Sequence, residues 1–338
     1  MLKALVYIPL SWLYRLGIFI RHMLYDHHLL LSFTAELPTI CVGNLAVGGT
    51  GKTPMTAYLI QRLKEAGYHP AVLSRGYKRA THGFVLADPT STAATIGDEA
   101  MLLHSAFPDV PVAVCESRVY GIKQLNRLIE SLDVIVLDDA MQHRALRCGL
   151  TILLTPYDHL YIDDHLLPWG TLRDLPSRAL KADIVVVTKC PDTIRPIDMR
   201  VVDNRLHLPT YQRLYFAGTA YEPIEQKGTP LVLCGIAQPQ YLMEHIRNSY
   251  PQAQLMAFRD HYRFKPRDID AILERAKHFD FVLTTEKDLQ RLRATDLEQR
   301  LQKEGKTLVA LPIHMRFCAA KDAFDKQILS YVHENSRK

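Results

Sequence analysis

The sequence predicts an α/β protein with a mostly parallel sheet covered by helices on both faces, followed by a smaller α/β domain. Short, nearly continuous apolar runs alternate with helical stretches, as expected for buried parallel strands joined by crossover helices. The alternation changes near residue 205, where a turn-rich stretch begins. The chain has 338 residues, which is long enough for two domains.

Residues 1–35 are predicted to form an amphipathic helix. Arg15 interrupts the apolar run and no small-residue cleavage site follows, so a signal peptide is not expected. The uncharged length is shorter than the roughly 20 residues that span a bilayer. On a helical wheel one side gathers the polar residues Lys3, Tyr7, Ser11, Tyr14, Arg15, Arg21 and His22. The other side carries Leu2, Leu5, Trp12, Leu13, Leu16, Phe19, Ile20 and Met23.

Such a helix can lie in a membrane interface, with its cations near lipid phosphates and its apolar side among acyl chains. The alternative is an ordinary helix packed on the protein's own core. Pro9 is expected either to kink the helix or to mark its true start.

Residues 36–204 are predicted to form the core domain. The expected strands are 39–45, 71–76, 112–115, 133–139, 151–157 and 182–189, with helices at 54–67 and 118–132 among the intervening stretches. Ligands bind at the carboxyl ends of the strands in sheets of this kind, so polar residues at those ends are candidates for a site.

A hairpin-like linker is predicted at residues 205–228, before a smaller α/β domain at 229–332. The expected strands of that domain are 230–237, 253–258, 281–288 and 307–313, with helices at 238–250 and 266–279.

Composition excludes several classes of protein. The net charge of +5 is mild and the basic residues are scattered, so no nucleic-acid partner is expected. The six cysteines are widely spaced without a C-x-x-C pair, which argues against a zinc ribbon or disulfide framework and fits a reducing compartment.

The stretch "VGGTGKTP", residues 47–54, stands between a predicted strand and a predicted helix. That is the setting of a phosphate loop, although Ala46 occupies the position of the first glycine in G-x-x-x-x-G-K-[ST]. We expect Lys52 to bridge the terminal phosphates of ATP and Thr53 to bind Mg²⁺. The residues expected to hold the ATP phosphates are Gly48, Gly49, Thr50, Gly51, Lys52 and Thr53. The core is therefore predicted to be of the P-loop NTPase type.

Two acidic pairs accompany this loop. Asp138 and Asp139 end an apolar strand, where carboxylates complete a Mg²⁺ shell directly or through water. Asp98 and Glu99 precede a helical run, so they either cap that helix or supply a base for an attacking hydroxyl. We include Glu99 with Thr53, Asp138 and Asp139 among the candidate Mg²⁺ residues.

Several blocks together resemble the tetraacyldisaccharide 4′-kinase family of lipid A biosynthesis. They are "VGNLAVGGTGKTP", "LSRGYKR", "GDEA", "VIVLDDAMQHR", "LLPWGTLRDLPSRALKAD", "FRDHYRF" and "TTEKDLQRL", spread over about residues 40–293. The resemblance implies transfer of the γ-phosphate of ATP to the 4′-hydroxyl of a tetraacyldisaccharide 1-phosphate. It also implies a peripheral or monotopic location on the cytoplasmic face of the bacterial inner membrane, and we expect a monomer.

The resemblance also implies roles for individual residues. Asp98 would be the catalytic base and His261 its partner, with Lys52 as the third catalytic residue. Contacts to the disaccharide and its phosphate would fall on Arg75, Tyr77, Arg118, Gln142, His143, Arg173 and Asp174. The chain departs from the family pattern at "GTLRD", where Asp174 is one methylene shorter than the usual glutamate, and at Ala140 and Met141.

Two other classes of nucleotide-binding protein share part of this sequence pattern. A membrane-associated switch ATPase of the partitioning kind has a signature lysine where this chain has Val47. A nucleotide-dependent carrier or metal-insertion protein lacks its expected Cys/His cluster here. "TTEKD", residues 284–288, is equally compatible with a helix cap and with a nucleotide or hinge contact, so the predicted site does not include it.

Overall fold

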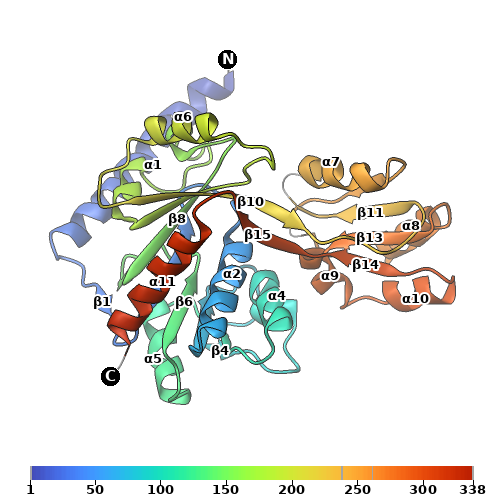
Figure 1. Cartoon of the computed structure of the whole chain (residues 1–338), viewed down its shortest axis with the longest axis horizontal. Helices are drawn as coiled ribbons and strands as arrows, with labels where there is room; N and C mark the ends of the chain where they lie inside the picture. Colours follow the sequence, from blue (N-terminus) through green and yellow to red (C-terminus); the bar gives the residue numbers. More distant parts are fainter. Residues whose placement is uncertain (1, 237–238, 261, 337–338) are drawn as a thin grey trace.

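The computed structural model describes residues 2–236, 239–260 and 262–336. Within these residues, nine strands form one sheet that is the centre of the larger unit (Figure 1). In spatial order they are β15 (Ile313–Phe317), β10 (Arg213–Tyr221), β9 (Ile184–Thr188), β8 (Leu150–Pro156), β2 (Thr39–Asn44), β6 (Val134–Asp138), β3 (Pro70–Ser74), β5 (Val112–Val114) and β4 (Val85–Leu86). The strands at the two edges, β15 and β4, pair antiparallel with their neighbours, and every other pairing is parallel.

Helices cover both faces of this sheet, which confirms the predicted fold class. One face packs against α2 (Lys52–Glu65) and α11 (Lys321–Asn335), and α4 (Asp98–Ala106) packs next to them together with the short α3 (Ala93–Ile96). The opposite face packs against α5 (Arg118–Leu128), α6 (Pro196–Leu206) and the 3-10 turn η2 (Pro176–Lys181), with η1 (Tyr161–Asp163) beside them. Side chains alternate along β2: Ile40 and Val42 enter one core and Cys41 the other.

A second, all-parallel sheet lies to the right in Figure 1 and belongs to the smaller unit. Four strands form it in the described part of the chain: β12 (Gln254–Ala257), β11 (Pro230–Cys234), β13 (Phe281–Thr285) and β14 (Leu308–Leu311). Its helices are α7 (Pro239–Ser249), α8 (Pro266–Ala276), α9 (Glu286–Leu292) and α10 (Leu297–Lys303). Ile269 and Ile272 of α8 pack on one face, and Leu242 and Ile246 of α7 pack on the other.

The connection between the two units differs from the predicted boundaries. The stretch expected to be a hairpin-like linker, 205–228, contains β10, which is a strand of the large sheet between β9 and β15. The chain returns along β15 and continues into α11, whose Phe324, Ile328 and Val332 are buried in the larger core. The last twenty residues of the expected smaller domain, 229–332, therefore pack with the core instead. Pairings so distant along the chain leave no local signal in the sequence.

The N-terminal helix α1 (Leu2–Asp26) is docked through its polar side. Ser11 and His22 are buried, whereas Leu5, Trp12, Leu13 and other apolar side chains of the helix are exposed. Arg21 is exposed and donates to the Gln142 carbonyl at 2.9 Å. The alternative, an ordinary helix packed on the protein's own core, does not hold for the apolar side, which is exposed. Pro9 lies inside the helix rather than at its start.

Residues 4–26 are long and apolar enough, by length and composition alone, to cross a membrane. After the helix, β1 (Phe33–Thr34) pairs in parallel with β7 (Leu146–Arg147) and so attaches this segment to the core domain.

Candidate active site

The glycine-rich loop follows β2 and leads into α2, as predicted. Gly48 and Gly51 have φ of +111° and +88°, a region where a side chain would strain the backbone. The Thr188 hydroxyl at the end of β9 donates to the Thr50 carbonyl at 2.8 Å, which fixes the loop against the sheet. Lys52 is the first residue of α2, where the backbone N–H groups have no partner within the helix, and its ammonium group donates to Asn44 Oδ1 at 3.4 Å.

Ala46 occupies the glycine position without strain. It forms an antiparallel bridge with Leu172, and its carbonyl accepts a hydrogen bond from the Asn44 amide at 2.7 Å. The next residue, Val47, donates its N–H to the Thr171 carbonyl at 2.8 Å. Residues 171–172 therefore hold the chain at Ala46 and Val47, and the backbone conformation that needs glycine begins at Gly48.

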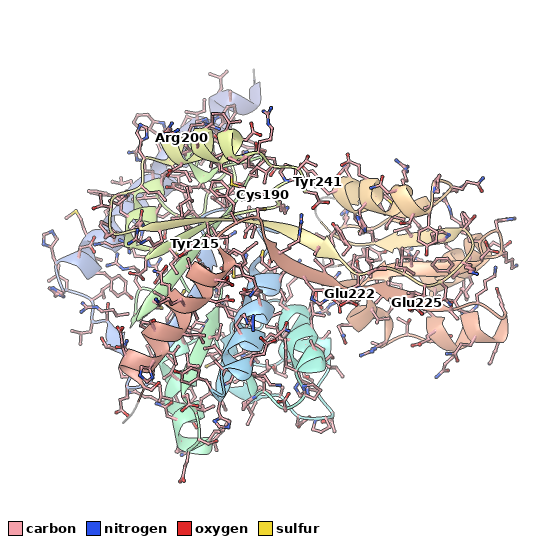
Figure 2. All side chains as sticks on the ribbon, viewed as in Figure 1. Cys190, Arg200, Tyr215, Glu222, Glu225 and Tyr241 are labelled. Carbon is pink, nitrogen blue, oxygen red and sulfur yellow. The ribbon has the colours of Figure 1, made fainter. Side chains whose placement is uncertain are left out.

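A cleft of about 1780 Å³ lies between the two units and is lined by the phosphate loop, residues 48–53. Arg75, Tyr77, Glu99, Asp139 and Arg173 line the same cleft from the core. The smaller unit contributes Tyr241, which lies at the junction in Figure 2 and whose hydroxyl donates to Asp158 at 2.6 Å. The cleft is large enough for a nucleotide with a second substrate beside it.

Asp138 is fully buried at the end of β6. Its Oδ1 accepts a long hydrogen bond of 3.5 Å from Thr56, and its Oδ2 has no partner. Burial, followed by the negative charges of Glu99 and Asp139, raises the pKa of Asp138 to about 7 against the opposing effect of Lys52. A carboxylate held in this way is stabilised by a cation placed against it.

Asp139 has the opposite electrostatic character. Burial acts to raise its pKa, but Lys52 and Arg173 outweigh burial and hold the pKa of Asp139 below its ordinary value. Arg173 binds both of its carboxylate oxygens, at 2.9 Å for Oδ2, and also contacts the Asn44 amide oxygen. Asp139 itself has a positive φ of 53°, which turns the chain sharply after β6.

The described residues contain no group of three or more histidine, cysteine or acidic side chains already arranged around a metal ion. Mg²⁺ commonly takes only one or two carboxylates from a protein and completes its shell with phosphate oxygens and water. The orphaned Asp138 oxygen near Glu99 and Asp139 fits that kind of site.

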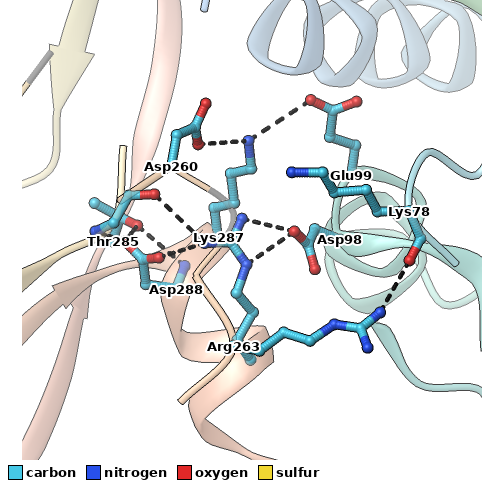
Figure 3. Close-up of polar contacts among 10 residues, drawn as sticks. Lys78, Asp98, Glu99, Asp260, Arg263, Thr285, Lys287 and Asp288 are labelled. Carbon is cyan, nitrogen blue, oxygen red and sulfur yellow. Dashed lines mark hydrogen bonds and ion pairs between the residues drawn. The ribbon is translucent and has the colours of Figure 1, made fainter. Parts of the chain in front are cut away.

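Asp98 and Glu99 open α4, but neither caps it, since Gly97 is the N-cap residue and no side-chain cap bond forms. Asp98 is paired with Arg291 of the smaller unit at 2.6 Å. Lys287 of the same unit lies 3.7 Å from Glu99 (Figure 3). Lys287 is also 3.8 Å from Asp260. The predicted partner of Asp98, His261, lies outside the described residues.

The predicted substrate residues do not all lie in one place. Arg75 and Tyr77 are exposed in the cleft, and Arg173 lines it beside Asp139. Arg118 is buried and donates to the Asp139 carbonyl at 3.1 Å, so it shapes the turn that carries the acidic pair. Gln142 donates to the Asn44 carbonyl at 2.5 Å.

His143 and Asp174 are set back from the cleft. Burial and the neighbouring Arg118 lower the pKa of His143 to about 4, and its Nε2 is buried without a partner. Asp174 is buried against His22 of α1, at 2.6 Å. The helix α1 therefore rests on the residues predicted to contact the substrate: Tyr14 donates to the Arg173 carbonyl at 3.1 Å, next to Asp174.

Sequence reasoning missed the cations of the smaller unit. Lys287 and Arg291 belong to the "TTEKDLQRL" block, whose first five residues fit either a helix cap or a site contact by sequence alone. Thr285 does cap α9, and the same segment also reaches the acidic pair on α4. The available signal was two basic residues four apart directly after a buried strand, which places both on one side of a helix.

The fold and the site define a P-loop nucleotide-binding phosphotransferase of two α/β units. The sequence matches the tetraacyldisaccharide-1-P 4′-kinase family (LpxK) over residues 3–333. The chain belongs to this family.

Relatives with that name are similar over nearly their whole length. The tetraacyldisaccharide 4′-kinase of Bacteroides thetaiotaomicron is 42% identical, with 97% of this chain and 93% of the relative covered. That of Flavobacterium johnsoniae is 41% identical, with 97% and 96% covered. A crystal structure of LpxK from Aquifex aeolicus in complex with ATP superimposes with a TM-score of 0.76 at 26% identity, covering 98% of this chain and 100% of that one.

Proposed function

We propose that this protein transfers the γ-phosphate of ATP to the 4′-hydroxyl of a tetraacyldisaccharide 1-phosphate in lipid A biosynthesis. The observation that carries the proposal is that Arg173 contacts both the cleft and the N-terminal helix. Its side chain lines the same cleft as the phosphate loop, and its carbonyl accepts from Tyr14 on a helix with an exposed apolar side. A phosphate donor site and an element suited to lipid are thereby joined at one residue.

The phosphates of ATP are proposed to lie on Gly48, Gly49, Thr50, Gly51, Lys52 and Thr53. The N–H groups at the start of α2 and the Lys52 ammonium supply positive charge there, which stabilises the phosphates and the charge that develops during transfer.

Mg²⁺ is proposed to be held by Thr53 and Asp138, with Asp139 and Glu99 acting directly or through water. The partnerless Asp138 Oδ2 and the gathered negative charge support this assignment. When bound, the ion supplies positive charge against the phosphate oxygens.

Asp98 is proposed as the base that orients and deprotonates the sugar hydroxyl, with His261 as its partner. The O–H bond of the acceptor breaks as its oxygen bonds to the γ-phosphorus. The bond from that phosphorus to the bridging oxygen breaks, and ADP leaves. Water is kept from the reaction when the smaller unit covers the cleft.

The acceptor disaccharide is proposed to contact Arg75, Tyr77 and Arg173 directly. Guanidinium groups bind oxyanions through paired N–H donors, which suits the existing 1-phosphate. Arg118, Gln142 and Asp174 are proposed to shape this side of the site from behind, because each forms a hydrogen bond within the protein. His143, whose Nε2 is buried without a partner, is proposed to contact the disaccharide or its phosphate.

The protein is proposed to be a monomer bound to the cytoplasmic face of the bacterial inner membrane as a peripheral or monotopic protein. The exposed apolar side of α1 supports contact with acyl chains. We also propose an organisation of helix 1–35, core and smaller unit, with residues 313–335 assigned to the core.

The test is coupling of ATP consumption to the lipid. With γ-labelled ATP and Mg²⁺, label is expected to move into a tetraacyldisaccharide 1-phosphate presented in detergent micelles, and ATP consumption is expected to require that lipid. A switch ATPase gives the reverse result: nucleotide turnover without the lipid and no labelled lipid, which would refute the proposal.

A further inference from the structure

Arg291 is held rigidly within the smaller unit before it reaches the core. Its side chain is only 6% exposed, and its Nη1 donates to Asp288 Oδ1 at 2.7 Å and to the Gly235 carbonyl at 3.4 Å. Asp288 is fully buried and accepts from the Gly235 N–H and the Thr285 hydroxyl, both at 2.8 Å. These hydrogen bonds connect the residue after β11 to α9, and the Arg291 guanidinium group takes part in them.

Gly235 is required for this arrangement. A Cβ at that position would come within 2.9 Å of Asp288 Oδ1, closer than real Cβ contacts allow. The guanidinium group is planar and rigid, so the hydrogen bond from Nη1 to the fully buried Asp288 also fixes the direction in which Nε and Nη2 point.

That edge faces Asp98 across the junction between α9 and α4. Nε of Arg291 donates to Asp98 Oδ2 at 2.8 Å, and Nη2 forms an ion pair with the same oxygen at 2.6 Å. Two other cations lie at this junction: Lys287 is 3.7 Å from Glu99 and 3.8 Å from Asp260, and Arg263 donates to the Lys78 carbonyl at 3.1 Å. The carboxylate that receives the paired donors is the proposed base.

We infer that Arg291 is a positioning residue that fixes the orientation of the Asp98 carboxylate and makes that orientation depend on docking of the smaller unit. This inference rests on the proposed function, because it concerns the base of that reaction. When the smaller unit docks over the cleft, it brings an already ordered guanidinium to the first residue of α4. Two contacts from one rigid guanidinium to the same carboxylate oxygen restrict the position of that oxygen more than a single flexible ammonium does.

The experiment measures label transfer from γ-labelled ATP to the lipid by wild type, Arg291→Met, Arg291→Lys, Asp98→Asn and the two double variants that combine Asp98→Asn with either Arg291 substitution. Arg293→Met is the matched control, since Arg293 is an exposed arginine two residues further along. Thermal unfolding and ATP binding are measured for each variant.

Arg291→Met is expected to lower kcat by roughly 10–100-fold, because small misplacement of a reacting group is that costly, with KM for ATP unchanged. Arg291→Lys is expected to keep part of the lost rate. Adding Arg291→Met to Asp98→Asn is expected to cost almost nothing further, since the residue acts through Asp98. Arg293→Met is expected to behave as wild type.

The inference is overturned if the two losses simply multiply in the double variant, if Arg291→Met is as fast as wild type, or if it is faster, as release of an inhibitory contact would make it. Should Arg291→Met fail to fold, the cycle with Arg291→Lys decides in the same way. A wild-type protein that transfers no label refutes the proposed function instead, so the two failures are distinguishable.

Discussion

Nε2 of His22 on the N-terminal helix lies 2.6 Å from Oδ1 of Asp174, and both side chains are buried. Arg144 donates to the other ring nitrogen of His22 at 2.9 Å. The helix is thus fastened by polar contacts to the segment that also carries Arg173. The apolar side of the helix stays exposed because polar side chains such as His22 face the protein.

Removing the histidine tests this attachment. His22→Ala leaves the buried Asp174 carboxylate without that partner, so the free energy of unfolding is expected to fall by about 1–3 kcal/mol. ATP binding is expected to be unchanged. Chemical denaturation followed by circular dichroism checks the first point, with His27→Ala, at an exposed histidine just beyond the helix, as control. Equal stabilities of the two variants would contradict the account.

The exposed side of α1 gives a second prediction. Trp12 and Leu16 are 71% and 54% exposed, and replacing both with glutamate is expected to abolish co-sedimentation with anionic phospholipid vesicles while ATP binding persists. Leu128→Glu, at a leucine of α5 that is 52% exposed, is the control and should bind vesicles normally. Retained vesicle binding by the double variant would rule out this helix as the membrane contact.

The ionised Asp138 side chain is predicted to lower the free energy of unfolding of the protein without bound ligands. Its pKa is raised from 3.8 to about 7, first by burial, so the stability that its protonated form contributes below pH 3.8 is lost as the pH rises through 7. At pH 8, without nucleotide or Mg²⁺, Asp138→Asn is therefore expected to be more stable by about 1–3 kcal/mol.

Label transfer by the same variant is expected to fall by roughly 10²-fold or more, because a charge-stabilising group is removed. Asp203→Asn, at an exposed aspartate of α6, controls for the loss of a surface charge. If Asp138→Asn proves less stable than wild type at pH 8, this electrostatic description is wrong.

His143 contributes a pH dependence of the opposite sign. Its pKa is lowered from 6.5 to about 4, by burial and then Arg118, so the folded protein favours the neutral ring. Stability from this residue is complete above pH 6.5 and is lost as the pH falls toward 4. Between pH 7 and 4.5, His143→Gln is expected to lose about 1–2 kcal/mol less than wild type. His82→Gln, at an exposed histidine, should follow the wild-type curve; coincidence of all three curves would refute the prediction.

Local patterns in the sequence predicted the fold class because buried parallel strands and the helices between them are local features. The phosphate loop and the position of Asp138 at the end of β6 follow from the same reasoning. The pairing of β15 with β10 could not be predicted in that way, since about a hundred residues separate the partners along the chain.

The site shows the same limit. The wheel placed Ser11, Tyr14 and His22, which contact the protein, on one side of α1, but it gives no information on which side faces the protein. That depends on Asp174 and Gln142, more than a hundred residues away. Likewise the short "TTEKD" block fits a helix cap and a site contact equally well. Only the folded chain brings Arg291 to Asp98 across a separation of 193 residues.

The most direct test of the central claim is the position of the new phosphate. The purified protein is given ATP, Mg²⁺ and either the tetraacyldisaccharide 1-phosphate or its 4′-deoxy analogue, and the products are analysed by mass spectrometry and ³¹P NMR. We predict one added phosphate monoester on the natural lipid, at the 4′ oxygen with the 1-phosphate retained, and no product from the analogue. Phosphorylation of the 4′-deoxy analogue, or a diphosphate formed at position 1, would contradict the account.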